Sequence, residues 1–161
     1  MDLEEQLETQ RKEAVTALQI LLGYADELAA DGLDRNREML EGLKRFSRCM
    51  ASYLCVEGHD QGCDERIMEK YIQPYEKMLA GDKNALDGVP HQNITSENMD
   101  TFWSAISRYR QEMLADYDPV YDVDLEFCDS IVKIMGKQVG DPETQTNEMD
   151  GKQDIPAMQT M

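Results

Sequence analysis

Cysteine and histidine side chains gather in one short stretch of the chain. Cys49, Cys55, His59 and Cys63 lie within fifteen residues, and both residue types are ligands that zinc accepts. On one helix, Cys49 and Cys55 would lie about 9 Å apart along the axis and point about 120° apart, too far for a single ion. Cys55, His59 and Cys63 therefore form the more feasible set, with Cys128 or a carboxylate as the fourth ligand.

A zinc site of this kind would make the protein a zinc-stabilised structural subunit of a larger assembly. The alternative is that the thiols are buried or inert, because cysteine is among the residue types most often found in protein interiors.

Pairs of acids three residues apart suggest a second kind of metal site. The three pairs are Glu5 with Glu8, Glu38 with Glu41, and Glu126 with Asp129. The chain resembles in size and helix content the helical nucleotide pyrophosphatases, which use such pairs, and the resemblance implies a magnesium-dependent nucleotide pyrophosphohydrolase. Magnesium needs acids that converge from different helices. Helical periodicity instead places the last two pairs away from the apolar stripes of their helices, which indicates solvated faces.

Acid-base catalysis has few candidate residues in this sequence. The only histidines are His59 and His91. The His59-Asp60 dipeptide is similar to the dyad of metal-dependent phosphohydrolases, but those enzymes also need an earlier histidine, and none precedes His59. No nucleophile pattern or glycine-rich phosphate loop is present. The sequence therefore favours a non-catalytic protein, with no catalytic residue and no required cofactor.

Net charge indicates what such a protein would bind. The chain has 33 acids and 16 bases, a formal net charge of −17 and a pI near 4.3. A polyanion gains nothing by displacing the counterions of nucleic acid or of an anionic membrane, so direct binding to either is disfavoured. A protein partner with a basic surface is favoured instead, although acidity can also serve solubility alone.

The first predicted helix carries the acids that we expect to contact such a partner. These candidate docking residues are Glu4, Glu5, Glu8, Asp26 and Glu27. Small proteins that block restriction or CRISPR machinery as nucleic-acid mimics are similar to this chain in size and charge. The resemblance implies an inhibitor that occupies the phosphate-binding site of a nucleic-acid-binding protein.

One basic strip interrupts this acidity. Arg37, Lys44 and Arg48, with Arg45 beside them, share one face of the second predicted helix. The strip could hold a phosphate or an acidic partner. The alternatives are pairing with acids of the first helix, or plain exposure.

The elements that must position these residues are predicted to be helices throughout. Apolar residues recur at steps of three and four, and the chain has few glycines and prolines, so we expect an all-α fold. The predicted helices are residues 2–30, a second from Asp34 to just before Gly58, 64–80 with a kink at Pro74, 95–116 capped by Thr95, and 123–136 ending at Gly136.

These helices should form one compact bundle over residues 1–139, with the first two as an antiparallel hairpin. Val123 is expected on the buried face of the last helix. Residues 140–161 are polar, lack aromatic side chains and lack periodicity, so they are predicted to be a disordered acidic tail. The acidic start of the chain and the absence of a long apolar run predict a cytoplasmic protein. The oligomeric state is not predicted.

Overall fold

The computed structural model describes residues 2–56, 66 and 69–139, and it contains no strand within them. This confirms the all-α prediction. The elements are α1 (Leu3–Asp31), α2 (Leu33–Val56), α4 (Gln73–Leu79), α5 (Met99–Ala115), the short 3-10 helix η1 (Pro119–Tyr121) and α6 (Asp122–Val139). The predicted tail, 140–161, lies outside the described residues.

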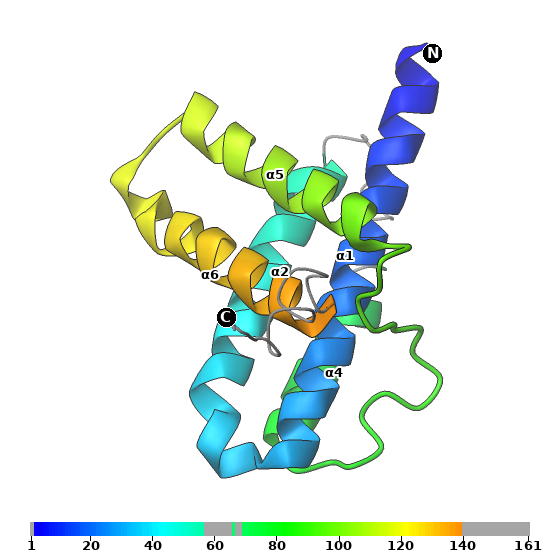
Figure 1. Cartoon of the computed structure of the whole chain (residues 1–161), viewed down its shortest axis with the longest axis vertical. Helices are drawn as coiled ribbons and strands as arrows, with labels where there is room; N and C mark the ends of the chain where they lie inside the picture. Colours follow the sequence, from blue (N-terminus) through cyan, green and yellow to red (C-terminus); the bar gives the residue numbers. More distant parts are fainter. Residues whose placement is uncertain (1, 57–65, 67–68, 140–161) are drawn as a thin grey trace, which may run out of the picture.

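Helices α1 and α2 run antiparallel side by side (Figure 1). Helix α1 begins with a capping box, in which Asp2 accepts a hydrogen bond from the Glu5 amide and Glu5 accepts one from the Asp2 amide. It ends at Gly32, where the sequence predicts a stop. The second helix then starts at Leu33, one residue before the predicted cap Asp34.

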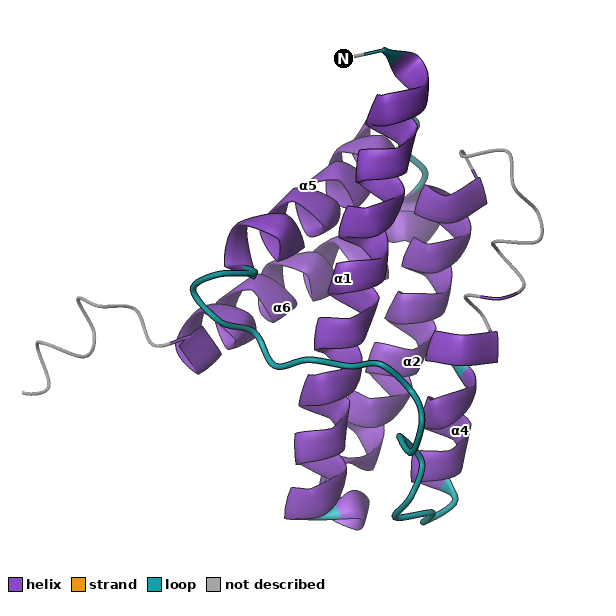
Figure 2. Ribbon diagram, turned by 90° about the vertical axis from the view of Figure 1, so that its right-hand side faces the viewer, coloured by secondary structure: helices purple, strands orange, loops and turns teal. Residues whose placement is uncertain are grey.

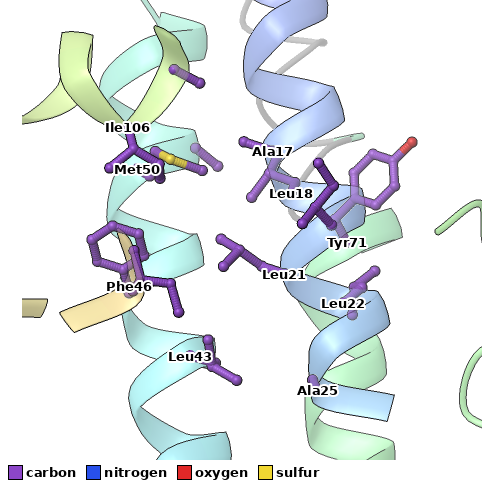
Figure 3. Packing of buried hydrophobic residues seen from close by; sticks show 14 of the residues in the cluster. Ala17, Leu18, Leu21, Leu22, Ala25, Leu43, Phe46, Met50, Tyr71 and Ile106 are labelled. Carbon is purple, nitrogen blue, oxygen red and sulfur yellow. The ribbon is translucent and has the colours of Figure 1, made fainter. Parts of the chain in front are cut away.

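The hydrophobic core lies between these two helices and the elements packed on them. In Figure 3, Leu21 of α1 points towards Phe46 of α2, whereas Leu22 lies on the other side of α1. Both leucines are almost completely buried, as are Leu18, Leu43 and Phe46. Side chains of this size each contribute about 1.5–3 kcal/mol when buried. The apolar stripes that predict the helices therefore also build the core.

Helix α4 packs beside α2, after a break in the predicted third helix. Residues 69–71 are helical, Ile72 forms a turn, and α4 restarts with Pro74 in its first turn. Proline has no amide hydrogen to donate, which an interior helical position would require but a first turn does not. Gly81 then ends the element with a positive φ of 89°, a conformation that glycine adopts without strain.

A long loop, residues 80–98, crosses α1 on its way to α5 (Figure 2). The Gln92 amide donates to the Gln19 carbonyl oxygen at 3.2 Å, and the two side-chain amides also bond to each other. A Cβ at position 23 would lie 2.3 Å from the Gln92 carbonyl oxygen. Gly23 is therefore needed in the middle of α1, because only glycine lets the loop approach so closely.

Helix α5 begins later than predicted, at Met99 instead of Thr95. Thr95 does cap the preceding turn: its hydroxyl oxygen accepts from the Asn98 amide, while the Asn98 side chain accepts from the Thr95 amide. The reciprocal bonds of a capping box are present, but the backbone between them forms a turn.

Helix α6 differs from the prediction at both ends. It starts at Asp122 and continues through Gly136 to Val139. A glycine inside a helix costs only about 1 kcal/mol, and Met135 beside Gly136 is buried in the core, so packing outweighs this cost. Val123, predicted to be buried, is 60% exposed.

Helix α6 reaches the hairpin through its aromatic side chain. The Phe127 ring stacks on Phe46 of α2 at a centroid distance of 4.8 Å. A Cβ on Gly42 would lie 3.1 Å from the Phe127 ring. The absence of a side chain at Gly42 therefore leaves room for this contact.

Candidate functional site

The predicted zinc ligands fall mostly outside the part of the chain that can be described. Cys55 belongs to the last turn of α2, whereas His59 and Cys63 lie outside the described residues. Over residues 2–56, 66 and 69–139, no three His, Cys, Asp or Glu side chains come together in a group that could hold a metal ion. The zinc site stays a prediction.

The carboxylate pairs lie on separate parts of the surface. Glu38 and Glu41 are exposed on α2, and Glu126 and Asp129 are exposed on α6. These are the solvated positions that helical periodicity predicts. Asp129 also accepts a hydrogen bond from Arg110 of α5 at 3.3 Å. Nothing in the described residues therefore gathers the ligand set that a magnesium-dependent pyrophosphohydrolase would need.

The bases of the strip on α2 are ion-paired, but with acids outside the first helix; Arg37 pairs with Asp34 of α2 itself at 3.5 Å. Lys44 and Arg48 both approach Glu76 of α4, at 3.5 and 3.8 Å. Arg45 makes an ion pair of 2.5 Å with Asp124 of α6. The sequence predicts pairing as one alternative, but the partners come from α2, α4 and α6 instead of α1. Four bases share three acids, so a single positive charge is left for a phosphate.

The predicted docking acids lie in two places. From Glu8 to Asp26 is eighteen residues along a continuous helix, which corresponds to about 27 Å. Glu4, Glu5 and Glu8 lie at the start of α1, whereas Asp26 and Glu27 lie near its end. A single contact with a small basic patch would therefore not cover both groups.

The acids at the start of α1 are partly engaged. Glu5 belongs to the capping box, and Glu8 accepts a hydrogen bond from Arg11 at 3.2 Å. Glu4 is exposed and makes no ion pair with any described residue. The negative electrostatic potential at this end of α1 is therefore weaker than three free glutamates would produce.

The acids near the end of α1 border small hollows. Asp26 lines one of about 400 Å³ that also includes Met78 and Lys83. Glu27 lines another of about 180 Å³ beside Tyr24. Burial, and secondarily the negative charge of Glu27, raises the pKa of Tyr24. Neither hollow holds a nucleophile with a neighbouring base.

Two thiols and a tyrosine occupy the junction of α2, α5 and α6. Burial raises the pKa of Cys128 to about 12, and it also raises the pKa values of Cys49 and Tyr109. The nearby carboxylate of Asp124 adds to each of these shifts. All three groups are neutral at physiological pH, so these thiols are poor nucleophiles.

Comparison of the chain with protein-family models, curated proteins and solved structures finds no match. The interpretation of the surface therefore depends on this chain's own geometry. No helix in its described part is long and apolar enough to cross a membrane.

The sequence analysis missed a long acidic stretch that contains no base. Residues 111–132 contain seven acids and no base, and they form the end of α5, η1 and most of α6. Only Asp124 among these acids is buried. A count of charge along the sequence in short windows would have found this stretch, because it needs no knowledge of the fold.

Proposed function

We propose that this protein is a non-catalytic, acidic helical binding protein that docks on the basic surface of a protein partner. By occupying a site meant for phosphates, it would inhibit a nucleic-acid-binding protein as a nucleic-acid mimic. The observation that carries this proposal is the unequal pairing of charges on α1, α2 and α5.

The bases of α1, α2 and α5 are all engaged. Every Arg and Lys of α1, α2 and α5 lies in an ion pair: Arg11, Lys12, Arg35, Arg37, Lys44, Arg45, Arg48, Arg108 and Arg110. By contrast, Glu4, Asp26, Glu27, Glu38 and Glu41 make no ion pair with a described residue and are exposed.

Unpaired surface carboxylates favour a basic partner for two reasons. They create a negative potential that accelerates encounter with a positive surface. Their attraction also weakens as salt is added, because the Debye length falls to about 8 Å at physiological ionic strength. Binding through this surface should therefore be strongly salt-dependent.

The test is capture on the immobilised full chain, with elution by rising salt and identification of the eluted protein. Two variants neutralise the two acid groups separately: Glu4→Gln with Glu8→Gln, and Asp26→Asn with Glu27→Gln. A matched control, Asp87→Asn with Glu97→Gln, removes the same charge from the exposed loop. We expect at least one α1 variant to elute at lower salt than the control.

The mimic part of the proposal has its own measurement. The captured protein is mixed with duplex DNA or RNA, and the chain is added as a competitor. We expect nucleic acid to be displaced. A partner with no basic surface, or one that elutes identically from all variants, would contradict the proposed function.

A further inference from the structure

Apolar side chains are exposed at one end of the molecule, where α5 turns into α6. Six large hydrophobic residues are exposed in the described part of the chain, and four of them lie within residues 114–123. Leu114 is 46%, Tyr117 52%, Val120 66% and Val123 60% exposed. We name residues 114–123 the acidic apolar corner. In Figure 1 it lies at the far end of α5 and α6, away from α1.

Local hydrogen bonds hold the corner in one conformation. The Asp118 side chain accepts from the Val120 amide at 2.9 Å, and the Asp118 carbonyl accepts from the Tyr121 amide at 2.8 Å. The Tyr117 hydroxyl donates to Asp122 at 2.6 Å. Pro119 further fixes the backbone. The exposed valines are thus presented by an ordered turn, which lowers the entropic cost of binding.

The corner is also anchored to the rest of the bundle. Asp124, the next acid after Val123, is buried and ion-paired with Arg45 of α2. Phe127, one helical turn further on, stacks on Phe46. Asp124 and Phe127 thus fix the start of α6 against α2. Val120 and Val123, which come just before them in the chain, remain exposed to solvent.

Carboxylates surround these apolar side chains. Asp116, Asp118 and Asp122 are exposed within the corner, and no base occurs from residue 111 to 132. Arg110, just before this stretch, is already ion-paired with Asp129. Apart from Arg45, which is held in the ion pair with Asp124, the charges shown beside these apolar side chains are therefore negative.

We infer that the acidic apolar corner is the docking surface for a protein partner whose own surface has an apolar recess bordered by lysine or arginine. This inference rests on the proposed function and adds a second contact surface for the same partner, beside the exposed acids of α1. Apolar contact would supply affinity, and the acid rim would select the partner.

The negative charge of the acidic apolar corner disfavours the other molecules that could bind there. A second copy of the chain would place one acid rim against another, and like charges repel at an interface. An anionic membrane and a nucleic acid would be repelled in the same way. A neutral apolar partner would leave the carboxylates without counter-charges as they lose water. A basic protein surface satisfies both the apolar side chains and the acids.

The test uses the full chain and a defined probe, a synthetic amphipathic helical peptide with leucines along one face and lysines on the flanks. We expect amide NMR signals of residues 114–123 to shift on titration. Val120→Ser with Val123→Ser should weaken binding about tenfold. The matched control, Leu3→Ser with Val132→Ser, removes exposed apolar side chains elsewhere and should bind as the wild type does.

A second pair of variants tests the rim. Asp116→Asn with Asp122→Asn should weaken binding and flatten its salt dependence, because asparagine keeps the acceptor for Tyr117 but loses the charge. Asp87→Asn with Glu97→Gln is the control of equal charge. A peptide with serine in place of leucine should bind at least about tenfold more weakly. Equal binding by this peptide, or shifts outside the corner, would overturn the inference.

Failure of the corner and failure of the proposed function give different results. If the α1 variants lower the elution salt of the captured partner but the corner variants do not, the inference is wrong and the proposed function stands. If neither set changes capture, both are wrong. Concentration-dependent dimers in sedimentation, lost in Val120→Ser with Val123→Ser, would assign the corner to a second copy and overturn the inference.

Discussion

In the α1 and α2 hairpin every base is ion-paired, and Leu3 is the only exposed large apolar side chain among its described residues, whereas the acidic apolar corner contains acids and no base and exposes four apolar side chains. Both regions mix apolar and charged residues in sequence. The apolar residues of the hairpin build the core. Those of the corner are exposed to solvent and contribute nothing to folding, and exposed apolar side chains grouped in this way are typical of a contact surface.

The comparison predicts its largest effect inside the hairpin. Phe46→Ala removes a fully buried ring that contacts Tyr109 and Phe127, so we expect a loss of about 3–5 kcal/mol in unfolding free energy. Urea denaturation followed by circular dichroism measures it. A loss below about 1 kcal/mol would mean that α6 does not depend on this contact for its position.

The next effect concerns the ion pair that joins the two regions. Arg45→Met keeps the aliphatic bulk but leaves the buried Asp124 without its partner. We expect a loss of about 1–3 kcal/mol, the cost of an unsatisfied buried group. Double replacement, Arg45→Met with Asp124→Leu, should recover part of this loss. If the single variant is as stable as the wild type, water must already satisfy Asp124.

A smaller effect appears in alkali. Burial raises the pKa of Cys128 to about 12 and raises the pKa values of Tyr75 and Tyr109, whereas in the unfolded chain cysteine ionises near about 8.5 and tyrosine near about 10. Below these unfolded values the stability is complete. As pH rises through them, only the unfolded chain ionises, so stability falls.

Melting temperatures between about pH 8 and about pH 10.5, a range that includes the unfolded pKa values of about 8.5 and about 10, measure this loss. Cys128→Ala should make the decline shallower, because it removes one of the ionising groups. A melting temperature that stays constant over the range would show that these groups are accessible to hydroxide in the folded protein.

The smallest effect on stability is expected at the corner. Val120→Ser with Val123→Ser should change the unfolding free energy by less than about 0.5 kcal/mol per site, because both side chains already face water. Denaturation of this variant beside Phe46→Ala gives the comparison directly. A loss as large as that of Phe46→Ala would place the valines in the core and remove the contrast between the regions.

The sequence predicts the helices well where a local signal acts alone. Gly32 ends α1, and Gly81 with its positive φ ends the segment of α4. Prediction fails where tertiary packing decides. Gly136 does not stop α6, since Met135 beside it is held in the core. Val123 stays exposed because the buried stripe of α6 runs through Asp124, Cys128, Ile131 and Met135.

The candidate surfaces are harder to predict than the helices. Helical periodicity correctly places Glu38 and Glu126 on exposed faces, but it cannot show that Glu76 and Asp124 would pair with bases of the strip. Those contacts join residues far apart in the chain. The acid-rich stretch 111–132 needs only a charge count, yet its exposed valines are recognised only once burial is known.

The loop that crosses α1 also constrains the order in which the chain folds. Its bond between Gln92 and Gln19 joins residues seventy-three positions apart, so it forms only after α1 is in place. The contacts between α1 and α2 do not depend on a long loop closing first, because a short turn at Gly32 links the two helices. We therefore expect the hairpin to form early and to serve as the template on which the loop, then α5 and α6, settle last.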